Sequence, residues 1–278
     1  VDVLAMDEVF HQDLDFGALL PEVPVRALGV ASDTPFYRLD PLRQLAVVRR
    51  AAPAIRRAVG SPDVVLAFND GALQRLAFRA ADRARQAILL DGMISDYADP
   101  PGIAARTRRI LKRIGRPALG TPLGVILPSD AGLSPVDRVF VVGRHSAEHL
   151  VRMGARARKI VATGLPRWPE PSAGERPRAV RRVLYLSGSF AWHNRSGTGD
   201  AQLADAATLG ATCADLGLEL VVRVHPRDDA DAWTAAGFAT IRAGAEPLEA
   251  SIRRADVVLA MVSTGLLEAI TFGRIARP

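Results

Sequence analysis

Short apolar runs alternate along this chain with longer stretches that are rich in Ala and Arg and have helical periodicity. This alternation predicts an α/β fold, in which helices pack on a mostly parallel sheet. The expected strands are VDVLAM, VVLAF, AILL, RVFVVG and KIVATG in the first part and VRRVLYLSG, LELVVRV and DVVLAM in the second. Val1 already lies inside the first run and Pro278 follows soon after the last, so we expect a chain truncated at both ends.

A segment between the two sets of strands differs in composition. The stretch GLPRWPEPSAGERPRA, Gly164–Ala179, is dense in Pro, Gly and charge and has no apolar periodicity, as expected of a linker. A chain of 278 residues is also long enough to bury two cores. We therefore expect two doubly wound, Rossmann-like domains facing a cleft, over residues 1–165 and 180–278, with a linker over 166–179.

Composition excludes several kinds of site. The one cysteine, Cys213, allows neither an intrachain disulfide nor a metal cage built from cysteines. The formal net charge is +6, but only Lys112 and Lys159 among the 36 basic residues are lysine, so we attribute the arginine excess to genome composition. Aromatic residues make up 5% of the chain and are scattered, although nucleic-acid surfaces use them for stacking. We expect no nucleic-acid partner.

The sequence also bears on location. No apolar segment approaches the roughly 20 residues that span a bilayer, and the N-terminus lacks the layout of a secretory signal, so we expect a cytoplasmic protein. In RTRRILKRIG, apolar residues lie among Arg106, Arg109, Lys112 and Arg113, which permits peripheral contact with the inner membrane face. The commoner interpretation of such a run is a solvated helix face that covers the domain core.

Ligands in open parallel sheets collect beyond the carboxyl ends of the strands, so the residues that follow each apolar run are the candidates for a site. In the second half these residues are mostly small or hydroxylated, which suits a phosphate, and Glu268 can reach a ribose diol. The candidates for ligand binding are Ser187, Gly188, Ser189, Arg223, His225, Pro226, Ser263, Thr264, Gly265 and Glu268.

His225 ends a strand in LVVRVHPRDD, where a proline prevents its continuation. A histidine at this edge can donate a hydrogen bond to a phosphate oxygen, and Pro226 turns the chain so that the ring faces the cleft. The alternative is a histidine that only caps the strand and bonds the nearby Asp228 or Asp229.

RVHPRDD and the later ADVVLAMVSTGLLEAITFG resemble the donor-binding domain of GT-B glycosyltransferases. The resemblance is to the bacterial sialyltransferase and polysialyltransferase group and to the glycerophosphotransferases of wall teichoic acid synthesis. It implies that the His-Pro and Ser-Thr pairs contact a nucleotide and its phosphates. It also implies a nucleotide-sugar donor bound by residues 180–278, and a glycan or lipid-linked acceptor on the side of residues 1–165.

AILLDGMISDY, Ala87–Tyr97, is similar to the sialyltransferase stretch of an acidic pair, a glycine and a downstream tyrosine, with Leu90 at the first acidic position. The resemblance makes Asp91 the base for the acceptor hydroxyl, with His225 stabilising the departing phosphate. Burial after a strand can raise the pKa of such a carboxyl. A plain Asp-Gly turn is the alternative for Asp91, and Asp70 in FNDG is a second candidate whose commoner role is a helix N-cap.

We expect no metal and no cofactor besides the nucleotide sugar, because no Asp-x-Asp motif directly follows an apolar strand run. Two other functions stay open. One is a GT-B sugar-nucleotide 2-epimerase, which shares this style of site and needs no acceptor, and a CDP-glycerol-type glycerophosphotransferase is a close variant of the transferase. The other is a zinc peptidase, because HSAEH, His145–His149, satisfies H-x-x-E-H. His145 falls at a helix start, however, and no helical third ligand follows.

Overall fold

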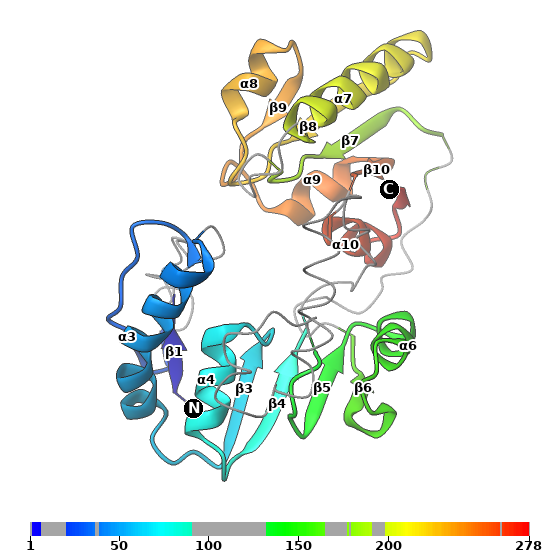
Figure 1. The fold of residues 1–278 in the computed structure, drawn as a ribbon. Coiled ribbons are helices and arrows are strands. Elements are labelled where there is room, and N and C mark those ends of the chain that lie inside the picture. The colour runs from blue at the N-terminus through cyan, green and yellow to red at the C-terminus, as the bar shows by residue number, and fades with distance from the viewer. Residues whose placement is uncertain are drawn as a thin grey trace. The chain divides into compact units, whose positions relative to one another are not determined.

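The computed structural model describes residues 2–6, 21–36, 39–90, 132–164, 177, 179–190, 198–261 and 263–277. The chain divides into two compact units, Val1–Leu165 and Pro166–Pro278. In both units every strand pairs with its neighbours in parallel, and a helix follows β2, β3, β5, β7, β8, β9 and β10 (Figure 1). The predicted α/β class is confirmed.

The second unit is a single five-stranded sheet with helices in the crossover connections. Its elements are β7 (Arg182–Leu186), α7 (Thr198–Asp215), β8 (Glu219–Arg223), α8 (Ala230–Ala235), β9 (Ala239–Ile241), α9 (Leu248–Arg254), β10 (Val257–Leu259), α10 (Gly265–Thr271) and β11 (Ile275–Arg277). The strand order is β11-β10-β7-β8-β9, so the chain builds outward from β7 and then returns to its other side. The order reverses between β7 and β10, which is the topological switch point where such sheets bind ligands.

Both faces of β7 are buried, as a central parallel strand requires. Leu184 and Leu186 pack into a cluster with residues of α9, β10 and α10, including Ile252. Tyr185, which points to the other face, packs with Trp233 of α8. This alternation explains why VLYL is a continuous apolar run, and it places helices on both sides of the sheet.

The first unit contains two separate parallel sheets. Its elements are β1 (Val3–Ala5), β2 (Val25–Ala27), α3 (Pro41–Val59), β3 (Val64–Phe68), α4 (Ala72–Ala80), β4 (Arg85–Leu89), β5 (Arg138–Val141), α6 (Arg144–Arg152), the 3-10 helix η3 (Ala157–Lys159) and β6 (Ile160–Ala162). β1 pairs with β2, and the other sheet has the order β3-β4-β5-β6.

Two apolar clusters hold the first unit together. One joins the inner face of α3 to α4, with Ile55 and Leu73 fully buried. The other lies on the larger sheet, where Ile88 of β4 and Val139 of β5 pack against Leu150 of α6. Leu90, directly after β4, belongs to this second cluster and is 2% exposed, so an apolar residue is required there.

Candidate functional site

The polar residues that follow β7, β8 and β10 gather at one edge of the sheet in the second unit. β7 lies between the other two strands, with Leu186 opposite Arg223 and Tyr185 opposite Leu259. Beyond the paired residues, the backbone N–H of His225 donates to the hydroxyl of Ser187 at 2.9 Å. The ends of β7, β8 and β10 are neighbours because the strand order reverses beside β7, which places β8 on one side of β7 and β10 on the other.

The start of α10 touches the end of β7 directly. A Cβ built on Gly265 would lie 2.6 Å from Cδ1 of Leu186, a separation that real Cβ atoms do not show. A larger residue at this position would require the Leu186 side chain to move, so glycine permits the close approach of α10 to β7. The contact brings Ser263 and Thr264, just before the helix, toward the end of β7.

Ser187 is the centre of a hydrogen-bond network at this edge. Its hydroxyl donates to Oδ2 of Asp228 at 2.7 Å while accepting from His225 N, and the side chain is buried. The indole N–H of Trp233 donates to the same Asp228 oxygen at 2.8 Å. Because the Ser187 proton is directed at Asp228, this hydroxyl fixes the position of the His225 segment in the structure instead of presenting a donor to a ligand.

The side chain of His225 has a defined orientation. Its Nδ1 accepts a hydrogen bond from the backbone N–H of Arg227 at 3.1 Å, and its carbonyl accepts from Asp228 N at 2.9 Å. In a neutral imidazole with an accepting Nδ1, the proton is on Nε2. The ring therefore carries its N–H donor on Nε2, as the phosphate role of His225 requires. The turn that follows Pro226 orients the ring through the backbone N–H of Arg227.

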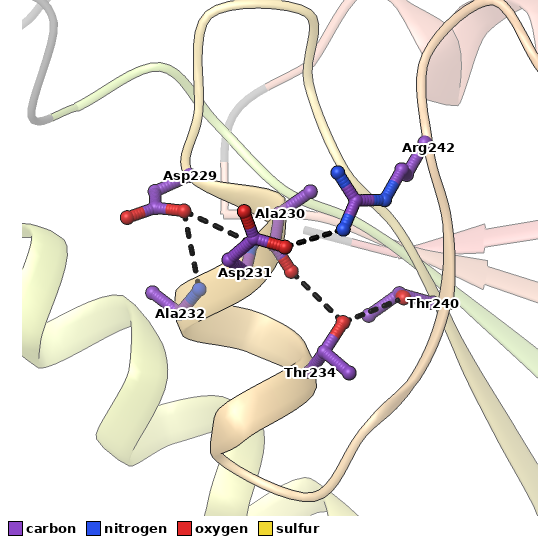
Figure 2. Close-up of polar contacts among 7 residues, drawn as sticks. All are labelled: Asp229, Ala230, Asp231, Ala232, Thr234, Thr240 and Arg242. Carbon is purple, nitrogen blue, oxygen red and sulfur yellow. Dashed lines mark hydrogen bonds and ion pairs between the residues drawn. The ribbon is translucent and has the colours of Figure 1, made fainter.

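α8, which supplies Trp233, is fixed at both ends (Figure 2). Asp229 caps the helix by accepting from Asp231 N at 2.9 Å and from Ala232 N at 3.1 Å. Near the other end, the hydroxyls of Thr234 and Thr240 lie 3.1 Å apart, which ties the helix to β9. The two adjacent acids of HPRDD thus have different functions: Asp229 starts a helix and Asp228 holds the strand end.

Gly188 meets a partner that the sequence does not reveal. Its N–H donates to Oε1 of Gln202 at 2.5 Å, and Gln202, on α7, is 2% exposed. A backbone N–H that the sequence offers for a phosphate is thus bonded within the protein. Ser189, the next residue, is half-buried.

Ser263 and Thr264 present hydroxyls before α10. The Ser263 oxygen accepts from Gly265 N at 3.0 Å, which leaves its own proton for another acceptor. Thr264 is exposed and its side chain does not cap the helix. Glu268 lies in the first turn of α10 and is half-buried. This segment therefore contributes two hydroxyl groups to the edge of the sheet where β10 ends.

Arg223, the last residue of β8, is bonded to the segment after β9. Its guanidinium donates to the hydroxyl of Ser251 and to the carbonyl of Glu246, both at 2.8 Å. The Glu246 carboxylate also accepts from Arg254 and Ser251, and these hydrogen bonds lower its pKa to about 2. Burial lowers the pKa of Arg223, which its attraction to Glu246 opposes. In the structure Arg223 joins β8 to α9, and its contact with a nucleotide stays a prediction.

The expected N-cap role of Asp70 is wrong. Gly71 is the N-cap of α4 and no side chain caps that helix. Asp70 is instead buried, and its two carboxylate oxygens accept from Gly132 N at 2.9 Å and Ser134 N at 3.0 Å. The nearby charge of Asp70 also opposes the lowering of the pKa of Arg75 by burial. Through these two hydrogen bonds the carboxylate anchors a segment that precedes β5.

Several expected residues cannot be placed. Asp91, the linker over 166–176 and the basic run from Arg106 to Arg113 lie outside the described residues. In HSAEH, His145 is exposed and His149 is buried on α6. Within the described ranges no group of three or more His, Cys, Asp or Glu side chains is arranged to hold a metal, so those ranges supply no third ligand for the zinc site of a peptidase. None of the helices in those ranges is long and apolar enough to cross a membrane.

No family model matches the sequence, and no curated protein matches it. Solved structures do. UDP-GlcNAc 2-epimerase of Methanocaldococcus jannaschii, in complex with UDP-GlcNAc and UDP, has a TM-score of 0.56 at 13% identity, over 94% of this chain and 70% of that one. The kitacinnamycin glycosyltransferase has a TM-score of 0.53 at 18% identity, over 91% and 67%.

Staphylococcus aureus MnaA, solved with UDP, has a TM-score of 0.51 at 12% identity, over 99% of this chain and 77% of that one. At such identities the shared property is the fold. These matches extend over nearly the whole chain, so they include both units. The predicted fold class, two Rossmann-like units of GT-B type, is confirmed.

Proposed function

We propose that this chain is a glycosyltransferase that moves a sugar from a nucleotide-activated donor to a cell-envelope glycan or glycolipid acceptor. The observation that carries the proposal is the meeting of three polar strand ends at the switch point of the second unit, with the N–H of His225 on Nε2. Two similar folds were solved with UDP, which supports a nucleotide as the ligand of such a site. The resemblance of HPRDD and VSTG to the sialyltransferase group supports transfer over other nucleotide chemistry.

On the donor side, we assign the phosphates to His225, Ser263 and Thr264. The Nε2 proton of His225 and the two hydroxyls are neutral donors, and they stabilise the negative charge that develops on the departing phosphate. Glu268, one turn into α10, is assigned to the ribose diol. Donors of this kind stabilise the leaving group without a metal, so we propose a metal-independent transfer.

On the acceptor side, we assign the base to Asp91. The acceptor oxygen attacks the anomeric carbon, the bond from that carbon to the phosphate oxygen breaks, and its electron pair stays on the phosphate. The acceptor proton passes to Asp91. A lipid-linked acceptor would be met at the inner face of the membrane by a cytoplasmic enzyme.

Nucleotide binding is the first test. Thermal shifts with CMP, CDP, UDP and GDP should show stabilisation by at least one of them, because a ligand at 100 times its Kd adds about 2.7 kcal/mol to the free energy of unfolding. His225→Ala should weaken binding roughly tenfold or more, as expected for a hydrogen bond to a charged group. His145→Ala, an exposed histidine of the first unit, is the matched control and should leave binding unchanged. Absence of stabilisation by all four nucleotides would reject the proposal.

A sugar-nucleotide 2-epimerase is the second candidate, favoured by the fold match to the M. jannaschii enzyme. The two functions differ in their need for an acceptor. An epimerase converts the sugar nucleotide when no acceptor is present, whereas a transferase releases free nucleotide only with one. Chromatography of the sugar nucleotide after incubation, with and without acceptor glycan, therefore decides between them.

A further inference from the structure

The outward face of α3 carries an ordered set of arginines. All five arginines of this helix are exposed: Arg43, Arg49, Arg50, Arg56 and Arg57. Arg43, Arg50 and Arg57 are spaced by seven residues, and so are Arg49 and Arg56. Seven residues are close to two helical turns, so the five side chains form two rows along the helix.

The residues between the two rows are apolar. At 100° per residue, the rows lie about a third of a turn apart, and Leu42, Ala46 and Pro53 fall between them. All three are exposed, and Leu42 keeps 79% of its surface in solvent. The opposite side of the helix is the one that packs on α4, through residues such as Val47 and Ile55. We call Leu42, Arg43, Ala46, Arg49, Arg50, Pro53, Arg56 and Arg57 the α3 arginine face.

Little in the described part of the chain offsets this charge. The 19 residues of α3 include no acid, and the N-cap Asp40 pairs only with Arg43, at 3.3 Å. In the described part of the chain, no ion pair involves the other four arginines. A general arginine excess in the chain does not explain why five arginines gather on α3. The 18 residues of α7, the other long helix, contain three aspartates and no basic residue.

We propose that the α3 arginine face binds an anionic lipid bilayer. The guanidinium groups match headgroup phosphates and can bind them in bidentate fashion. Their aliphatic stems and the exposed Leu42 suit the boundary between headgroups and acyl chains. A basic residue near an anionic surface raises affinity roughly fivefold. This surface belongs to the first unit alone, and it is independent of the transfer reaction proposed above.

Charge and chemistry favour lipid over other anionic partners. Nucleic-acid surfaces place aromatic or hydrogen-bonding side chains among the basic ones, whereas here the central strip is Leu, Ala and Pro. A second copy of the chain could bind the arginines through its acidic α7. The acidic side of α7 would, however, offer no apolar partner to Leu42.

The test is co-sedimentation of the full chain with vesicles. Vesicles of phosphatidylcholine with 30% phosphatidylglycerol should bind the protein, and pure phosphatidylcholine vesicles should not. R49Q/R50Q/R56Q/R57Q should lower the partition coefficient at least tenfold, with helix content kept because Gln is a good helix former. The matched control R83Q/R152Q/R156Q/R158Q removes the same charge from exposed positions elsewhere and should stay within about threefold of the wild type. Leu42→Ser should cause a smaller loss.

Three results would overturn the proposal. The first is no binding of the wild type to the anionic vesicles at low salt. The second is an equal loss of binding in both quadruple variants, which would mean that net charge alone is responsible. The third is self-association, or binding to an RNA or DNA oligonucleotide, that depends on the α3 arginine face while vesicles stay unbound.

Discussion

Asp70 and Asp228 follow parallel strands in different units, and both accept hydrogen bonds from residues far away in the sequence, yet they do different things. The donors to Asp70 are backbone N–H groups of Gly132 and Ser134, so its carboxylate anchors main chain. Besides the N–H of the adjacent Asp229, the donors to Asp228 are the side chains of Ser187 and Trp233, and Ser187 in turn holds the His225 segment. One carboxylate therefore builds the fold of its unit, whereas the other arranges polar groups at an edge where a ligand can bind.

The largest effect on activity should come from a third acid, Asp91, which we propose as the base of the transfer reaction. If Asp91 is the base of the first unit, Asp91→Asn should lower turnover by on the order of 100-fold or more and leave nucleotide affinity nearly unchanged. Steady-state kinetics with a nucleotide sugar and acceptor, together with thermal shift by the nucleotide, measure both quantities.

Asp70→Asn is the control for that experiment, because it should keep turnover in the protein that remains folded. If Asp91→Asn is fully active and Asp70→Asn is folded but inactive, the base is Asp70. Its catalytic role would then be more important than its role as an anchor of the main chain.

Asp70→Ala should cost about 3 kcal/mol of stability. It leaves two buried N–H groups without an acceptor and removes the charge beside the buried Arg75, and each unpaired group costs about 1 to 3 kcal/mol. Chemical denaturation with a probe of the first unit measures the loss. A variant that unfolds at the wild-type denaturant concentration would show that Asp70 is not an anchor.

Asp228→Ala should weaken nucleotide binding about tenfold, because the hydroxyl of Ser187 loses its acceptor and the His225 segment loses its fixed position. Isothermal titration gives the affinity. Asp229→Ala is the matched control from the next position: it removes only the cap of α8, at about 1 kcal/mol of stability, and should leave affinity unchanged. If Asp228→Ala and Asp229→Ala bind the nucleotide equally well, Asp228 does not arrange ligand-binding groups, and its role is structural like that of Asp70.

The smallest effect concerns Tyr185, which lies near Asp228. Burial raises its pKa to about 12, and the charges of Asp205 and Asp228 add to the rise. Between about pH 10 and 12 the folded protein holds a proton that the unfolded chain has lost. Stability should therefore fall as pH rises through this window, by up to about 1.4 kcal/mol per pH unit.

Tyr185→Phe should flatten that dependence. The Tyr185 hydroxyl has no hydrogen-bond partner within the described residues, so the change should cost little at pH 7. Denaturation curves of the wild type and the variant at pH 7 and pH 11 provide the comparison. Parallel pH dependences in the two proteins would mean that another group is responsible.

The sequence predicts where the polar strand ends are, but not which partners they choose. Ser187, His225 and Thr264 could be found because each follows an apolar run and parallel strands share one carboxyl edge. The hydrogen bonds from Gly188 to Gln202 and from Arg223 to Ser251 could not be predicted, because they join residues 14 and 28 positions apart through packing that no local pattern records.

The same limit applies to the short strands. β2, β9 and β11 are short and contain Arg, Ala or Thr among their three residues, so they lack the apolar run by which the other strands were predicted. For Asp70, the prediction failed because an Asp-Gly pair before a helix is typical of an N-cap, and the competing donors come from more than 60 residues away.

Van der Waals contact between Gly265 and Leu186 sets the distance between the start of α10 and the end of β7 in the candidate site. A van der Waals contact does not respond to ionic strength or to proton concentration. The attraction of the α3 arginine face for a charged surface, by contrast, is screened over about 10 Å at 0.1 M salt. Salt should thus be able to release the protein from a membrane while the separation between the end of β7 and the start of α10 stays the same.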